Sequence, residues 1–256
     1  MDNLSDLPKS LIWITLINYG YINYTKNFLK SMEKSKSTFK LIVFCIDTQT
    51  YEELKNCDNC ICLHTDFLYD RGLASDFKVW EEKDYKKIVF AKLDVILYTL
   101  KNTYDMGIEA VGYIDTDIVL FSDPTIIMLE AMNQNKDINI FSQCDEGGKT
   151  CSNKIDCQNI CSGVIVFRNN KSLYHIFEYT SEDINKFCTD QHFLTSNLKK
   201  LNIICLTIDK NIFLNGSYFH INHSNIFPDS ACLIHFNYMV GNQKQRKMIE
   251  QNVWYI

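Results

Sequence analysis

The sequence is poor in the residues that make flexible linkers, since 256 residues include only 9 glycines and 3 prolines. We therefore expect no long flexible linker. Internal repeats and low-complexity segments are also absent from the sequence. A chain of this length is sufficient for one large domain with a sizeable hydrophobic core.

The chain also lacks an excess of basic charge and a long apolar run. Its formal net charge is −5 and its pI is about 5.7, which argues against broad nucleic-acid binding. The apolar run Leu11–Ile17 is too short to span a membrane and has no basic leader before it. We therefore expect no signal peptide, no membrane span and a cytoplasmic location.

Cysteine, by contrast, is abundant and odd in number, with 11 residues. In a reducing compartment we expect most of them to be free thiols. Two groups could instead hold zinc, although neither has the paired spacing of a zinc ribbon. The tighter group is Cys57, Cys60, Cys62 and His64, and the looser one is Cys144, Cys151, Cys157 and Cys161.

Apolar strand patterns alternate with helical patterns along most of the chain, which predicts an α/β protein with a parallel sheet and helices on both faces. The predicted strands are Leu11–Leu16, Phe39–Ile46, Ile61–His64, Val111–Ile114, Ile138–Ser142, Gly163–Phe167, Ile203–Thr207 and Ala231–Phe236. The predicted helices are Ile22–Glu33, Tyr51–Lys55, Tyr85–Lys101, a short one from Pro124 capped by Asp123, Ser172–Tyr179 and Asp190–Lys199. Loops are predicted at Asp70–Asp84 and Gln143–Cys161, and a tail at Asn242–Ile256.

Asp115-Thr116-Asp117 follows one of these strands and precedes a second apolar run. Two carboxylates separated by one residue at a strand end can converge on one point, where they repel each other unless a cation lies between them. Mg²⁺ or Mn²⁺ shared with a diphosphate meets this need, and ligands of open α/β sheets bind at the carboxyl ends of strands. The alternative is a turn followed by a helix cap, because Asp123-Pro124 comes soon after.

Five stretches, taken in order, resemble the GT-A fold of nucleotide-sugar-dependent glycosyltransferases. They are Thr15–Tyr21, Phe90–Leu93, Tyr113–Pro124, Cys161–Arg168 with Asp190-Gln191, and Ile234–Lys244. The sequence is most similar to the nucleotide-diphospho-sugar transferase family that includes plant cell-wall xylosyl- and arabinosyltransferases, and more distantly to the glycogenin-like group. The resemblance implies an α/β, Rossmann-like GT-A domain over 1–256, with a mixed, mostly parallel central sheet flanked by helices. It implies a nucleotide-binding half at 11–125 and an acceptor-side half at 126–256, whose C-terminal tail closes the donor site.

The resemblance also assigns roles to individual residues. Asp115, Asp117 and His235 would bind Mn²⁺ or Mg²⁺, and the neutral imidazole favours Mn²⁺. Asp190 and Gln191 would act on the sugar, as nucleophile or as stabiliser of an oxocarbenium ion. The residues implied to bind the nucleotide sugar are Thr15, Asn18, Gly20, Tyr21, Asp47, Lys92, Asp115, Thr116, Gly163, Asn237, Gly241 and Lys244. The family has asparagine where this chain has Cys161, so that contact is not transferred to the thiol.

The implied reaction moves a sugar from a nucleoside diphosphate, in particular UDP, to an unknown hydroxyl acceptor with retention of configuration. Two other functions remain open. A sugar-nucleotide nucleotidyltransferase would need a glycine-rich phosphate loop with a basic residue after the first strand, where this chain has only Asn18-Tyr19-Gly20. A non-catalytic nucleotide-sugar-binding protein would not need both aspartates and His235.

Overall fold

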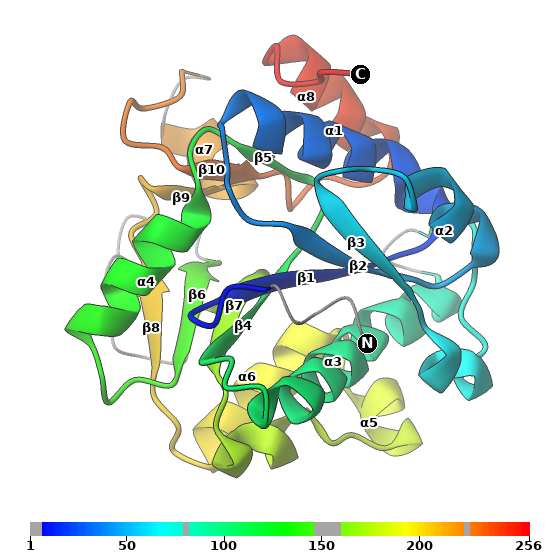
Figure 1. Ribbon diagram of the computed structural model, residues 1–256. Coiled ribbons are helices and arrows are strands. Elements are labelled where there is room, and N and C mark those ends of the chain that lie inside the picture. Colours follow the sequence, from blue (N-terminus) through cyan, green and yellow to red (C-terminus); the bar gives the residue numbers. More distant parts are fainter. Residues whose placement is uncertain (1–6, 79–81, 146–159, 223–225) are drawn as a thin grey trace.

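The computed structural model describes residues 7–78, 82–145, 160–222 and 226–256 (Figure 1). Most of the predicted loop Gln143–Cys161 lies outside these residues. Within them, no helix is long and apolar enough to cross a membrane.

A seven-stranded sheet forms the centre of the molecule, with strand order β3-β2-β1-β4-β7-β6-β8. The strands are β1 (Ile12–Ile17), β2 (Leu41–Cys45), β3 (Cys60–His64), β4 (Ala110–Ile114), β6 (Ile140–Cys144), β7 (Ile160–Arg168) and β8 (Cys205–Ile208). Only β7 runs antiparallel to its two neighbours, β4 and β6. The expected mixed, mostly parallel α/β sheet is therefore confirmed.

A second, three-stranded sheet has the order β5-β10-β9. It consists of β5 (Ile118–Leu120), β10 (Leu233–His235) and β9 (Phe213–Asn215). Strand β10 pairs antiparallel with β5, which begins directly after the two aspartates. This small sheet therefore brings a late part of the chain to the end of β4.

Helices cover both faces of the large sheet. Alternate side chains of β1 pack into two separate cores, one on each face of the sheet. Ile14 belongs to the core that includes residues of α3 (Lys83–Tyr104) and α6 (Asp190–Lys200). Trp13 belongs to the core that includes residues of α1 (Ile22–Lys34), α2 (Thr48–Leu54) and α4 (Pro124–Gln134). Figure 1 shows α1 on one side of the sheet and α3, α6 and α5 (Ser181–Lys186) on the other. Such two-sided burial explains the nearly continuous apolar sequence of the central strands.

The C-terminal segment differs from the predicted tail. Asn242–Glu250 forms helix α8, whose only buried residue is Met248. The residues after it pack against α1, where Asn27 Nδ2 donates to Val253 O at 3.1 Å and Asn27 Oδ1 accepts from Tyr255 N at 2.6 Å. Figure 1 shows α8 lying beside α1.

Other elements also depart from the expected pattern. The helix predicted at Ser172–Tyr179 is a 3₁₀ helix at Lys171–Phe177, and Asp66–Arg71 is another 3₁₀ helix. Helices α7 (Gly216–Asn222) and α5 were not predicted, whereas the turn expected at Asn18–Tyr21 is a short 3₁₀ helix at Tyr19–Tyr21.

In the part of the chain that the structure describes, eight cysteines are free, including Cys57, Cys60 and Cys62, while Cys144 is disulfide-bonded. Cys60 Sγ and Cys62 Sγ lie 3.8 Å apart, and the ring of His64 stacks on Tyr51 with centroids 4.0 Å apart. Among the described residues, these four do not form a group of ligand atoms close enough to hold one metal ion. The free-thiol alternative therefore fits this group better than the zinc alternative.

Candidate active site

Strand register brings three potential metal ligands together at the end of β4. The antiparallel pairing of β4 with β7 continues past the last pair, because Asp115 N donates to Gly163 O at 2.7 Å. The pairing of β10 with β5 places His235 opposite Ile118, and Phe236 N donates to Asp117 O at 3.0 Å. Backbone hydrogen bonds thus fix the positions of all three side chains.

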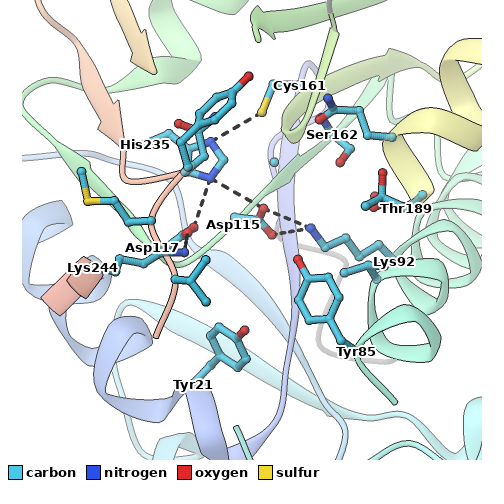
Figure 2. A pocket seen from close by; sticks show the side chains of 18 of the residues that line it. Tyr21, Tyr85, Lys92, Asp115, Asp117, Cys161, Ser162, Thr189, His235 and Lys244 are labelled. Carbon is cyan, nitrogen blue, oxygen red and sulfur yellow. Dashed lines mark hydrogen bonds and ion pairs between the residues drawn. The ribbon is translucent and has the colours of Figure 1, made fainter. Parts of the chain in front are cut away.

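Asp115, Asp117 and His235 each direct one ligand atom to a common point, and these atoms lie within 4.8 Å of one another. His235 Nε2 is 3.2 Å from Asp117 Oδ1 and 3.8 Å from Asp115 Oδ2 (Figure 2). Gly163 leaves this space open, since a Cβ there would lie 2.4 Å from His235 Cε1 and 2.5 Å from Asp115 Oδ2. Two carboxylates and an imidazole form a donor set suited to Mn²⁺ or Mg²⁺, so the residues fit the implied metal.

Two lysines flank the carboxylates. Lys92 Nζ donates to both oxygens of Asp115, at 2.8 and 3.0 Å, and Lys244 Nζ forms an ion pair with Asp117 Oδ2 (Figure 2). Burial disfavours charge on Lys92, but Asp115, together with the weaker effects of Tyr113, Asp190 and Tyr85, outweighs burial and holds the lysine pKa well above its usual value. Burial likewise opposes charge on Asp117, but Lys244 and His235 hold the pKa of that carboxyl well below its usual range.

His235 is almost fully buried, with 4% of its surface exposed. Its Nδ1 lies 2.9 Å from Gln143 Oε1 and 3.5 Å from Cys161 Sγ. Burial lowers the tendency of the ring to be charged, but Asp117 and, less strongly, Cys161 together outweigh burial and raise the pKa of His235 to about 10. Without a metal, a proton therefore neutralises part of the charge of the two aspartates.

These side chains form one wall of a cavity of about 570 Å³, a size typical of small-molecule sites. Tyr85, Val89 and Lys92 reach it from one face of α3, at the spacing that places residues on the same side of a helix. The predicted site residues that line it are Tyr21, Lys92, Asp115, Asp117, Gly163, Asp190, Gln191, His235, Asn237, Gly241 and Lys244. A smaller adjoining cavity is lined by Asn18 and Thr116, together with Tyr21, Lys92, both aspartates and Lys244.

Asp190 and Gln191 stand at the first turn of α6, which Thr189 caps by accepting from His192 N. Asp190 is 3% exposed, and burial raises the pKa of its carboxyl. Its Oδ2 accepts no hydrogen bond from any described residue. Gln191, in contrast, uses both ends of its amide: Oε1 accepts from Ser162 N at 3.1 Å, and Nε2 donates to Asp145 Oδ2 at 2.8 Å.

Asp145 is a central residue of the site that the sequence did not reveal. Besides Gln191, it accepts from Asn237 Nδ2 at 3.1 Å and from the Tyr238 hydroxyl at 3.1 Å. Burial raises the pKa of its carboxyl. Asp145 directly follows β6, within the predicted loop. Its hydrogen bonds connect α6 to the segment after β10, and these contacts become visible only once the distant strands are paired.

Thr15, Gly20 and Asp47 do not line either cavity among the described residues. Thr15 is buried in β1, and Asp47 caps α2 by accepting from Thr50 N at 2.8 Å. Asn18 Nδ2 donates to Ala74 O and Asp76 O, both at 2.8 Å, so this side chain holds the segment that follows residues 66–71. Of these four residues only Asn18 lines a cavity, the smaller one, and the contact of all four with a nucleotide stays a prediction.

Gly20 permits this packing, because a Cβ there would lie 2.1 Å from Phe77 N. We expect Gly20→Ala to displace the segment Ala74–Lys78 and to lower the free energy of unfolding by about 1–3 kcal/mol, the usual cost of overpacking. Urea denaturation measures the loss, and hydrogen exchange at Phe77 locates it. Asn23→Ala, at an exposed position on α1, is the control, and equal stability of the two variants would contradict this role for Gly20.

A model of the nucleotide-diphospho-sugar transferase family matches residues 36–249, which include every residue of the metal-binding group and both lysines. The chain belongs to this family. Membership makes it a glycosyltransferase, and the position of the Asp-x-Asp pair at the end of β4 agrees with this assignment.

Solved structures of glycosyltransferases with the GT-A fold resemble this member of the nucleotide-diphospho-sugar transferase family. The galactosyltransferase LgtC, solved with donor and acceptor sugar analogs, has a TM-score of 0.58 and 12% identity over 95% of this chain and 96% of its own. Mouse xyloside xylosyltransferase 1 has a TM-score of 0.55 and 11% identity over 90% of this chain and 98% of its own. At such low identity, these likenesses establish the fold alone.

The bifunctional glycosyltransferase WbbM has a TM-score of 0.57 and 11% identity over 96% of this chain, which spans 50% of the WbbM chain. No curated protein matches this chain by sequence. The family and the fold are thus established, and the substrates are not.

Proposed function

We propose that this protein is a divalent-metal-dependent glycosyltransferase that moves a sugar from a UDP-sugar to a hydroxyl acceptor with retention of anomeric configuration. The observation that carries the proposal is the group of Asp115, Asp117 and His235 in the wall of a 570 Å³ cavity. A non-catalytic binding protein would not need these three ligands beside two lysines. A nucleotidyltransferase is less consistent with both the family and the sequence after β1.

Asp115, Asp117 and His235 would hold Mn²⁺ or Mg²⁺, which when bound supplies Lewis-acid stabilisation of charge on a diphosphate leaving group. Lys92 and Lys244 add two positive charges at the same wall. In a buried site, fixed charges of this kind stabilise a developing anion far more than they would in water. The site therefore suits a reaction whose leaving group is a nucleoside diphosphate.

Asp190 and Gln191 line the cavity that contains the metal ligands. We assign them to the sugar, as nucleophile or as stabiliser of positive charge at the anomeric carbon. The unbonded Oδ2 of Asp190 supports this assignment, since a buried carboxylate oxygen without a donor is costly unless a ligand satisfies it. Tyr238, Met239 and Val240 line the cavity from the segment after β10 and are candidates to contact the acceptor.

A thermal-shift screen tests the donor. UDP-, GDP- and TDP-sugars are each added with Mn²⁺, with Mn²⁺ replaced by EDTA as the control. We expect UDP-sugars to raise the Tm, and only with the metal. A rise with GDP- or TDP-sugars alone would replace UDP in the proposal, and an equal rise in EDTA would contradict metal dependence.

The charge of His235 predicts how the metal-free protein responds to pH. The folded-state pKa of about 10 exceeds the ordinary value of 6.5. The stability due to the ring proton is therefore complete below about pH 6.5 and is lost progressively as the pH rises toward 10. In EDTA, we expect the Tm difference between wild type and His235→Asn to shrink from pH 6.5 to pH 8.5, because other groups that ionise in this range are present in both proteins.

The same comparison in Mn²⁺ is the control for this pH effect. A metal ligand must release its proton, so Mn²⁺ should raise the Tm of wild type more at pH 8.5 than at pH 6.5. A Tm difference that stays constant in EDTA across this range would show that His235 does not carry the proton.

A further inference from the structure

Gln143 lies behind His235, on the side away from the aspartates. It is fully buried in β6, directly opposite Cys161 of β7, at a point where the register of the two strands shifts. The family resemblance assigned no role to this residue, and it does not line the cavity among the described residues. Its side chain nevertheless joins the large sheet to the small sheet that carries His235.

The orientation of the Gln143 amide follows from its partners. Gln143 Nε2 donates to Leu214 O at 2.8 Å and to Phe213 O at 3.3 Å. Backbone carbonyls only accept, so the amide group at this end must be NH₂. The oxygen of Gln143 therefore points to His235 Nδ1, 2.9 Å away, and can only accept there.

That acceptor determines which nitrogen of His235 is free to bind. A hydrogen bond to Gln143 Oε1 requires a proton on Nδ1, which in the neutral ring leaves the lone pair on Nε2. Nε2 is the atom that faces Asp117 Oδ1, at 3.2 Å, and Asp115 Oδ2, at 3.8 Å. The carbonyls that anchor Gln143 belong to β9, whose residues Leu214 and Asn215 pair with Ile234 and His235 of β10.

We propose that Gln143 is a positioning residue that fixes the ring orientation and tautomer of His235, so that Nε2 presents its lone pair to the metal. This inference rests on the proposed metal-dependent function. Partners of this kind behind a metal-bound histidine commonly change metal affinity by about 10–100-fold when they are removed. Cys161 Sγ, at 3.5 Å, is too weak an acceptor to replace the amide.

Two variants test the role of Gln143. Gln143→Met keeps the length of the side chain but cannot accept from Nδ1, and we expect it to bind Mn²⁺ about 10–100-fold more weakly than wild type. Gln143→Glu keeps an acceptor for the Nδ1 proton of His235. A protonated carboxyl can donate its O–H to the carbonyls of β9, as the NH₂ group of Gln143 does, and its other oxygen then accepts from Nδ1. We expect its Mn²⁺ affinity to stay within about threefold of wild type. Mn²⁺ binding is measured by electron paramagnetic resonance with and without UDP.

A second readout requires no metal. In ¹⁵N-histidine spectra of the metal-free protein, we expect a slowly exchanging Nδ1 proton of His235, assigned by its loss in His235→Asn. It should persist in Gln143→Glu and disappear in Gln143→Met. Retention of this proton in Gln143→Met would overturn the proposed hydrogen bond.

The outcomes separate the two proposals. If wild type binds Mn²⁺ and Gln143→Met binds it equally well, or if both Gln143 variants are weakened alike, only the role of Gln143 is overturned. If wild type binds no Mn²⁺ with or without UDP, the proposed function fails, and the role of Gln143 in metal binding fails with it.

Discussion

Asp117→Asn is expected to lower the turnover of a UDP-sugar by about 10³-fold or more, with loss of Mn²⁺ binding. The substitution keeps the shape of the side chain but removes one of the two carboxylates that face the metal position. It also removes the charge that His235 and Lys244 neutralise. Release of UDP, measured with saturating Mn²⁺, gives the turnover, and electron paramagnetic resonance gives the Mn²⁺ affinity.

Asp123→Asn is the matched control for Asp117→Asn. It removes the same charge from a carboxylate that caps α4, where Oδ1 accepts from Thr125 N at 2.9 Å and Oδ2 accepts from Thr38 N at 2.8 Å. An asparagine can keep the cap but not the bond from Thr38 N, so this control loses some stability at a position away from the metal ligands and its Tm is measured as well. We expect its turnover to stay within about twofold of wild type. Turnover by Asp117→Asn equal to that of this control would contradict the role of the Asp-x-Asp pair.

Gly163→Ala is expected to lower Mn²⁺ affinity and turnover by at least about 100-fold while the protein stays folded. A Cβ at this position would lie 2.4 Å from His235 Cε1 and 2.5 Å from Asp115 Oδ2, so both ligands would have to move. A displacement of even 1 Å can cost about two orders of magnitude in rate. Turnover and Mn²⁺ binding are measured together with the Tm.

Gly112→Ala provides the contrast, because Gly112 lies on the neighbouring strand β4, where a Cβ would meet the ring of Trp13 at 2.6 Å. This variant should lose about 1–3 kcal/mol of stability but keep its Mn²⁺ affinity. Two variants with equal losses of stability and equal losses of Mn²⁺ affinity would show that Gly163 acts on the fold in general and not on the ligands.

The sequence predicted the large sheet well because its strands are apolar on both faces and its helices have clear periodicity. In the small sheet, β10 lies within the predicted strand Ala231–Phe236 and β5 within the apolar run after Asp117. Strand β9 has only three residues and was not predicted. Helix α8 was missed for a related reason: Asn242–Glu250 buries one residue, so its apolar stripe is too short to stand out from a polar tail.

Sequence reasoning found the site residues that belong to a recognisable motif and missed those that only contacts between distant segments bring to the site. Asp115 and Asp117 form a motif of their own, and the resemblance supplied His235. The structure brings these three together, as expected. Gln143 and Asp145 carry no motif, because their contacts arise from a register shift between β6 and β7 and from pairing with segments about 50–90 residues later. Periodicity along one strand cannot reveal such contacts.

The residues implied to hold the nucleotide base show that a motif can also be explained by packing within the protein. Asn18 lines the smaller cavity and Gly20 lines neither, but the polar side chain of Asn18 and the missing side chain of Gly20 both serve the packing of the segment around Asp76 and Phe77. The ring of Tyr21 lies against Phe77, with centroids 4.6 Å apart, and its hydroxyl donates to Lys78 O at 3.0 Å. A nucleotide base that stacks on Tyr21 would therefore have to share that position with Phe77 or displace it.

The most direct measurement is the release of UDP from a panel of UDP-sugars by the wild-type chain, assayed in Mn²⁺ and again in excess EDTA. Hydrolysis needs no knowledge of the acceptor, because water can replace it slowly. We predict that at least one UDP-sugar is cleaved in Mn²⁺ and that EDTA abolishes the activity reversibly. Cleavage that proceeds equally in EDTA, or no cleavage of any donor in Mn²⁺, would contradict a metal-dependent sugar transfer at Asp115, Asp117 and His235.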